Sequence, residues 1–116
     1  MDRTIWQSRL RELASCVSDT DYGSRKDVSR HNAAADEIRE LVRRVGCSSA
    51  SNLDALLSFL SDDILSSWIA YGVLEQCPTT AAQREQCVDV IREIARGDGP
   101  DALAAQGWLR DNDEAG

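Results

Sequence analysis

Few residues of this 116-residue chain could carry acid–base chemistry. It has a single histidine, His31, and one pair of adjacent carboxylates in a predicted loop, Asp62 and Asp63. His31 precedes Ala34 and Ala35 by three and four residues on the apolar side of a predicted helix, and no second histidine supports it. We therefore predict a half-buried packing histidine in preference to a general base. The carboxylate pair is explained by a helix cap with one further charge in the first turn.

The cysteines do not form a ligand pattern. There are four of them, without a C-x-x-C pair: Cys16, Cys47, Cys77 and Cys87. Because zinc sites need closely spaced Cys and His ligands, the sequence predicts reduced thiols and no metal or other cofactor. The sequence also lacks a recognisable catalytic triad and a glycine-rich phosphate loop. The prediction is accordingly that the protein is not an enzyme.

The net charge of −7 comes entirely from the second half of the chain. Residues 1–58 contain nine Arg or Lys and nine Asp or Glu, whereas residues 59–116 contain four and eleven. A nucleic-acid binder needs clustered Lys and Arg to displace the counterions of phosphates, so this balance argues against nucleic acid as a partner. It suits a basic protein partner, although acidity also simply keeps a domain in solution.

One acidic row is the predicted partner-binding surface. Glu85, Asp89 and Glu93 repeat every four residues on the polar side of a predicted helix. Like charges at this spacing repel by about 0.2–0.5 kcal/mol per pair, and a basic partner would relieve that repulsion. The alternative is a solvated face that is balanced by the arginines of the same helix. These arginines are Arg84, Arg92 and Arg96.

The spacing of apolar residues predicts an all-α fold of six helices. Apolar residues recur at steps of three and four in every long segment, and no segment alternates as a strand does. The predicted helices cover residues 4–17, 25–45, 53–60, 63–77, 81–96 and 100–110. The length fits one domain, 1–116, with 111–116 as a frayed tail. Since short connections favour antiparallel neighbours, we expect stacked antiparallel helical hairpins, including one formed by 53–60 and the central helix.

Capping residues define the predicted helix ends. Asp2 caps the first helix, Ser24 the second and Asn52 the third, while Asp62 begins the central helix and Thr79-Thr80 the fifth. Pro78 ends the central helix, because proline disfavours the helical conformation at the residue before it. Asp98 or Gly99 precedes Pro100 at the start of the last helix. Gly46 is predicted to end the second helix in a left-handed conformation.

The central helix is the predicted hub of the core. Between Ile64 and Leu74 only Ser66 and Ser67 are polar, so this helix must be covered on nearly every side. Gly72, in its middle, is predicted to let another helix cross closely, and Gly107 is expected to be analogous. All three tryptophans are expected to be core residues. Trp68 is expected in the hub, and the two nearest the chain ends, Trp6 and Trp108, are expected to be partly exposed.

A spaced pattern in the centre of the chain carries a family resemblance. It reads Leu56-Leu57-x-x-Leu60-x-Asp62-x-x-Leu65-x-x-Trp68-x-Ala70, followed by Leu74 and Pro78. This pattern resembles a HEAT-type repeat. More narrowly, residues 32–109 are similar to a small bacterial family of uncharacterised helical domains, some of which sit beside polymorphic toxins as immunity proteins. Asn32 matches an Asn of that family, whereas Ser66 stands where the family usually has Arg.

Two classes of function follow from the sequence. The preferred one is a non-catalytic protein-interaction module, and the resemblance implies an immunity-type protein that neutralises a toxin. The alternative is a small enzyme or ligand-binding protein with a cleft near His31, Tyr71 and Cys77. The absence of a long apolar run and of an apolar N-terminal segment predicts a cytoplasmic protein without a membrane partner.

Overall fold

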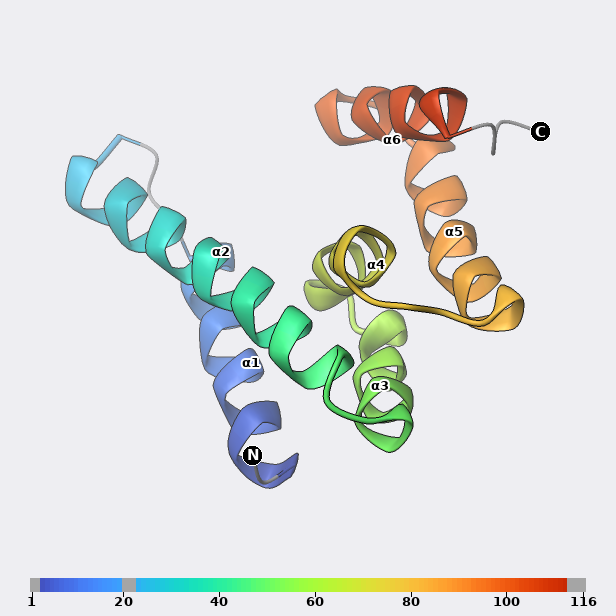
Figure 1. The fold of residues 1–116 in the computed structure, drawn as a ribbon. Coiled ribbons are helices and arrows are strands. Elements are labelled where there is room, and N and C mark those ends of the chain that lie inside the picture. Colours follow the sequence, from blue (N-terminus) through green and yellow to red (C-terminus); the bar gives the residue numbers. More distant parts are fainter. Residues whose placement is uncertain (1–2, 20–22, 113–116) are drawn as a thin grey trace.

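The computed structural model describes residues 3–19 and 23–112, and all of its regular elements are helices (Figure 1). They are α1 (Arg3–Ser18), α2 (Arg25–Gly46), α3 (Ala50–Leu57), the 3-10 helix η1 (Ser58–Ser61), α4 (Leu65–Gln76), α5 (Ala81–Ala95) and α6 (Pro100–Asp111). No strand occurs in these ranges, so the prediction of an all-α fold with six α-helices is confirmed. The predicted cap Asp2 and most of the predicted tail, 113–116, lie outside the described residues.

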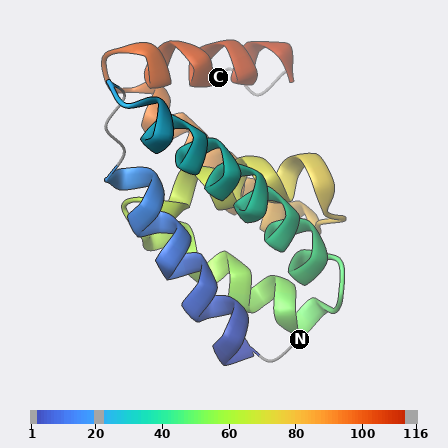
Figure 2. The ribbon, with the colours of Figure 1, turned by 90° about the vertical axis from the view of Figure 1, so that its left-hand side faces the viewer.

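α1 and α2 lie side by side and antiparallel, as two views at right angles show (Figures 1 and 2). The apolar positions predicted for α1 are all buried: Trp6, Leu10, Leu13, Ala14 and Val17. Ser24 caps α2 as predicted, since its side chain accepts a hydrogen bond from the backbone N of Asp27 at 3.3 Å. On the polar side of the pair, Arg9 Nη2 donates to Glu37 Oε1 at 2.7 Å. The first two helices thus form a hairpin that is held together by buried apolar contacts and by an ion pair on its surface.

The segment between α2 and α4 departs from the prediction at its start. Ser49, and not Asn52, caps α3: the side chain of Ser49 accepts a hydrogen bond from the backbone N of Asn52 at 3.1 Å. α3 therefore begins three residues earlier than predicted, at Ala50, and its last predicted turn is the separate helix η1. The cap at Asp62 is confirmed, because Asp62 Oδ1 accepts two backbone N–H bonds at the start of α4, each at 2.9 Å.

The predicted hairpin between residues 53–60 and the central helix is formed mainly by η1, which continues α3 and packs beside α4. In Figure 2, α3 and α4 run in roughly opposite directions. η1 occupies the connection and turns the chain, so α4 packs mainly on α2 and α5, with η1 beside it. The buried residues of α4 are Leu65, Ile69, Ala70, Gly72 and Val73. α4 is therefore the central helix, as the apolar run predicted, and it packs on both of its neighbours in sequence, η1 and α5, and on the more distant α2.

Two glycines allow close contacts between elements. A Cβ atom on Gly72 would lie 2.9 Å from Cγ1 of Val42, so the predicted close crossing of α4 with another helix is confirmed. The prediction for Gly46 is wrong: it is the last residue of α2 and has no positive φ. Its missing side chain instead leaves room for Sγ of Cys77. Gly107 has no such close neighbour, so it is not analogous to Gly72.

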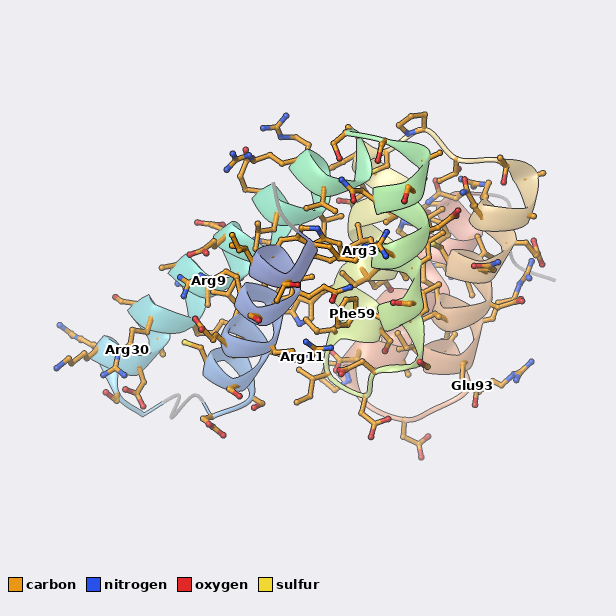
Figure 3. All side chains as sticks on the ribbon, turned by 90° about the horizontal axis from the view of Figure 1, so that it is seen from below. Arg3, Arg9, Arg11, Arg30, Phe59 and Glu93 are labelled. Carbon is orange, nitrogen blue, oxygen red and sulfur yellow. The ribbon has the colours of Figure 1, made fainter. Side chains whose placement is uncertain are left out.

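The tryptophans are distributed differently from the prediction. Trp6 is fully buried, although it lies near the chain end, because the ring of Phe59 in η1 packs against it with centroids 6.2 Å apart. The Phe59 ring also contacts a cation: the guanidinium of Arg11 lies 5.5 Å from its centroid (Figure 3). Trp108 is half-buried, as expected. Trp68 is also only half-buried, and the reason is a cleft beside α4.

The last two helices have strong start signals. Thr80 and Gln83 form a reciprocal capping box at α5, with bonds of 3.1 Å and 2.9 Å between side chain and backbone. Gly99, with a φ of 99°, precedes Pro100 at the first position of α6. α6 crosses the end of α5, on the side of the molecule away from α1 (Figure 1). Among the helices described, none combines the length and the apolar character that crossing a membrane requires.

Candidate functional site

The predicted acidic row lies on the exposed side of α5, but arginines of the same helix neutralise much of its charge. Glu85, Asp89 and Glu93 are all exposed, and Glu93 is at the outer edge of the molecule (Figure 3). Arg92 Nη1 lies 2.5 Å from Glu85 Oε1 and 2.9 Å from Asp89 Oδ1. Arg96 Nη1 lies 2.7 Å from Glu93 Oε2. In this row, two guanidinium groups oppose three carboxylates. That the row binds a partner stays a prediction.

A second surface is a cleft of about 740 Å³ between α2, α4 and α6. α4 lies between the other two helices (Figure 1) and supplies the floor of the cleft. The chemically distinctive lining residues are His31 and Arg39 of α2, Trp68, Tyr71 and Glu75 of α4, and Asp101 of α6. A volume in the range of about 300–1,000 Å³ is typical of ligand sites, and it also admits long side chains of a protein partner.

At the α2 side of the cleft, the Trp68 ring already contacts a cation of this chain. The guanidinium of Arg39 lies 5.5 Å from the Trp68 ring centroid, a distance at which the π face attracts positive charge. Arg39 Nη1 is also 3.2 Å from Asp36 Oδ1, which holds the guanidinium from its other side. The His31 ring completes this group, with its centroid 6.4 Å from that of Trp68. This part of the cleft therefore combines aromatic surface with a charge that is already paired.

At the α6 side, carboxylates surround a second aromatic pair. Tyr71 and Trp108 meet edge to face, with ring centroids 6.1 Å apart. Burial raises the pKa of Tyr71 from its ordinary value of 10.0, and the negative charges of Asp101 and Glu75 raise it further. Glu75 follows Tyr71 by one helical turn, whereas Asp101 comes from the first turn of α6.

The carboxylates of the cleft lack basic partners in the described part of the chain. No ion pair to Asp63, Glu75 or Asp101 is formed by any Arg, Lys or His described. The one arginine of the lining, Arg39, is paired with Asp36. Carboxylates beside low-dielectric aromatic surface focus a negative potential, which favours a nearby cation.

The alternative cluster of His31, Tyr71 and Cys77 is brought together only in part. His31 and Tyr71 both line the cleft. Cys77 does not, because its Sγ points toward Gly46 and the backbone oxygen of Val42, which is 3.7 Å away. The predicted packing of His31 is confirmed as half-buried, in contact with Trp68. Among residues 3–19 and 23–112, no three His, Cys, Asp or Glu side chains are placed to hold a metal ion.

Two carboxylates of the cleft, Glu75 and Asp101, were not among the residues that the sequence singled out. The only signal available was spacing: Tyr71 and Glu75 are four residues apart, and Asp101 and Trp108 seven, which places each pair on one helix face. Nothing in the sequence says that these two faces meet. Their meeting depends on how α6 packs beside α4, which only the structure gives.

The chain was compared with protein-family models, with curated proteins and with solved structures, and no match was found in any of the three. Over residues 3–19 and 23–112, the fold is an all-α domain of six α-helices, and its cleft is lined by carboxylates and aromatic rings.

Proposed function

We propose that the protein is a non-catalytic interaction module that binds a basic segment of another protein in the cleft between α2, α4 and α6. The observation that carries this proposal is a set of three carboxylates, Asp63, Glu75 and Asp101, around half-buried aromatic rings. Within residues 3–19 and 23–112, no Arg, Lys or His forms an ion pair with them. An arginine or lysine of a partner gains there both a carboxylate and a π face. Such residue pairs are common at the centres of protein interfaces.

The chemistry of the cleft favours a protein over nucleic acid as its occupant. Its unpaired charges are negative and would repel phosphates. The resemblance to toxin-associated immunity domains makes a basic toxin the first partner to examine, and an immunity role remains part of the proposal. The row Glu85, Asp89 and Glu93 is the second surface that such a partner would contact, because it lies on α5, next to the central helix.

The test compares two variants that lose the same charge. A partner is captured on the immobilised protein, identified by mass spectrometry and purified, and its affinity is then measured by calorimetry. We expect Glu75→Gln with Asp101→Asn to weaken binding by about tenfold or more, because a cation in the cleft loses both carboxylates. The matched variant, Asp89→Asn with Glu93→Gln, removes two charges from α5 and should weaken binding less, because Arg92 and Arg96 already neutralise these two carboxylates. Loss of affinity only in the α5 variant would place the partner on the row and contradict the cleft.

A second candidate function is the binding of a small organic cation, and its basis is the position of His31. His31 lies in the same cavity as carboxylates from two helices, which is the arrangement that would favour a ligand site or a small enzyme. Arginine and spermidine are suitable probes. A ligand of the cleft would raise the Tm of the wild-type protein, by mass action, and the rise should be lost in His31→Ala. A Tm that neither compound changes would contradict the small-cation hypothesis, and a protein segment would remain the proposed occupant of the cleft.

A further inference from the structure

Two cysteines that are far apart in sequence have adjacent sulfur atoms. Cys47 follows the last residue of α2, and Cys77 follows the last residue of α4. Their Sγ atoms lie 3.9 Å apart, and both residues are free thiols. A disulfide needs a separation of about 2.05 Å, so the two sulfurs must approach by about 1.9 Å. A rotation about the side-chain bonds of Cys47, which is exposed and begins a turn, supplies a movement of that size.

The surroundings hold the two thiols in this position. Cys47 Sγ is 3.4 Å from the backbone oxygen of Gln76, and Cys77 Sγ is 3.7 Å from that of Val42. Gly46 makes the arrangement possible, because a methyl group at residue 46 would overlap Cys77 Sγ. The close approach therefore depends on a residue without a side chain. It is independent of the cleft, which Cys77 does not line.

The two thiols differ in access to solvent and to reagents. Cys47 is exposed, whereas Cys77 is half-buried. Burial raises the pKa of Cys77 to about 12, and the neighbouring Cys47 thiol contributes to the rise, so Cys77 is a poor first nucleophile. Cys87 is fully buried, and burial raises its pKa to about 11. Cys47 is thus the thiol at which an external reagent would enter.

We propose that Cys47 and Cys77 form a redox modification site that closes to an intramolecular disulfide through exchange with a low-molecular-weight disulfide such as oxidised glutathione. The Cys47 thiolate attacks one sulfur of the reagent, forming a mixed disulfide and releasing one glutathione thiolate. Cys77 then loses its proton to solvent and attacks the Cys47 sulfur, releasing the second glutathione thiolate. Two protein thiols are oxidised, and one glutathione disulfide is reduced to two thiols.

Closure of this bond ties together the C-terminal ends of α2 and α4, two helices that line the cleft. The cysteines are separated by 30 positions, so the bond closes a loop of that length in the unfolded chain. The bond should lower the conformational entropy of the unfolded chain and so destabilise the unfolded state. We therefore expect the Tm of the oxidised protein to rise by about 5 °C or more. The proposal does not depend on which partner the cleft binds.

The chain offers a direct assay for this bond. Trypsin cleaves after Lys and Arg, and no Lys or Arg lies between Arg44 and Arg84, so Cys47 and Cys77 fall in one peptide, 45–84. After incubation of the folded protein with oxidised glutathione, we expect this peptide to lose the mass of two hydrogens. Reduction should restore the mass and remove the rise in Tm. The peptides that contain Cys16 and Cys87 serve as internal controls and should keep free thiols.

Two single variants decide the order of the steps. In Cys77→Ser the reaction should stop with one glutathionyl group on Cys47, and in Cys47→Ser peptide 45–84 should stay unmodified. Cys47→Ser changes an exposed side chain, so folding is not at risk in that variant. The proposal would be overturned by a wild-type protein that carries glutathione on Cys47 at completion, by a disulfide between two chains, or by recovery of both thiols unmodified.

Discussion

Gly72 of α4 lies so close to Val42 of α2 that a Cβ atom on residue 72 would be 2.9 Å from Cγ1 of Val42. Both residues are buried, and Val42 is branched at Cβ, so it cannot swing aside as the end of a long side chain would. The distance between the two helices is thus set by the absence of a single methyl group. α2 and α4 are two of the three helices around the cleft, and Gly72 is itself one of the lining residues.

The first prediction concerns this contact. Gly72→Ala should gain about 1 kcal/mol from helix propensity but lose more from overpacking, which typically costs about 1–3 kcal/mol. We expect a net loss of stability of up to about 2 kcal/mol, measured by urea unfolding followed by circular dichroism. Gly107→Ala is the matched control, since the nearest atom to its Cβ is Arg110 Nη2 at 3.8 Å. That variant should be more stable than the wild type, and equal gains in both variants would show that α2 and α4 are not held at this distance.

The second prediction ranks two tryptophans. Trp6 is fully buried against Phe59, whereas Trp68 is half-buried at the floor of the cleft. Truncation of a fully buried aromatic ring costs about 3–5 kcal/mol, so Trp6→Ala should destabilise the protein by that amount. Trp68→Ala should cost less, since part of its surface is already in contact with water. Urea unfolding of both variants measures the difference, and a larger loss for Trp68 would mean that the cleft is closed in solution.

The helices could be predicted from the sequence because their signals are local. Ser24 and Asp27 are three residues apart, and Pro100 starts α6 where its missing N–H costs nothing. One of the errors was also local. Both Ser49 and Asn52 are good capping residues, and the sequence does not say which one is used. Gly46 ends α2, but without the predicted left-handed conformation, and its role depends on Cys77, which is 31 positions further along.

The candidate site could be predicted only in fragments, because it is assembled from distant elements. His31, Tyr71 and Asp101 belong to three different helices, and helix periodicity says nothing about which of them are neighbours. The expected position of Trp6 was wrong for the same reason, since η1 covers it. The acidic row on α5 was visible because it lies within one helix. The arginines that balance it are on that helix as well, and only the structure shows that they are bound to it.

The third prediction concerns acid stability. Arg9 donates hydrogen bonds to Glu37, and this lowers the pKa of the Glu37 carboxyl from its ordinary value of 4.5. A carboxyl with a lowered pKa stabilises the folded state above its ordinary pKa, and this stability is lost as the pH falls through the folded value. Since both side chains are about half exposed, Glu37→Gln should cost less than about 1 kcal/mol at neutral pH.

The cost should disappear once the pH is below the folded pKa of Glu37, because the wild-type carboxyl is then neutral as well. Urea unfolding at neutral pH and in strong acid measures both values. Arg9→Gln and the double variant complete a mutant cycle, in which the double variant should cost little more than either single change. A difference between wild type and Glu37→Gln that persists in strong acid would assign the effect to packing and not to the ion pair.

The last prediction tests the electrostatics of the cleft through Tyr71. Its pKa is raised above 10.0, first by burial and then by the charges of Asp101 and Glu75. The chain has two tyrosines, so a Tyr22→Phe background leaves Tyr71 as the only phenol to titrate. In that background, Glu75→Gln with Asp101→Asn should lower the pKa of Tyr71, because the phenolate no longer faces two negative charges. The pKa should stay above 10.0, since the burial of the ring is unchanged.

The pKa of Tyr71 is measured by alkaline titration of the ultraviolet absorbance, within the pH range in which circular dichroism shows the helices intact. Asp89→Asn with Glu93→Gln removes the same charge from α5 and should leave the titration as it was. If the α5 variant shifted the pKa as far as the cleft variant, net charge alone would account for the effect, and Glu75 and Asp101 would not face Tyr71 across a shared cleft.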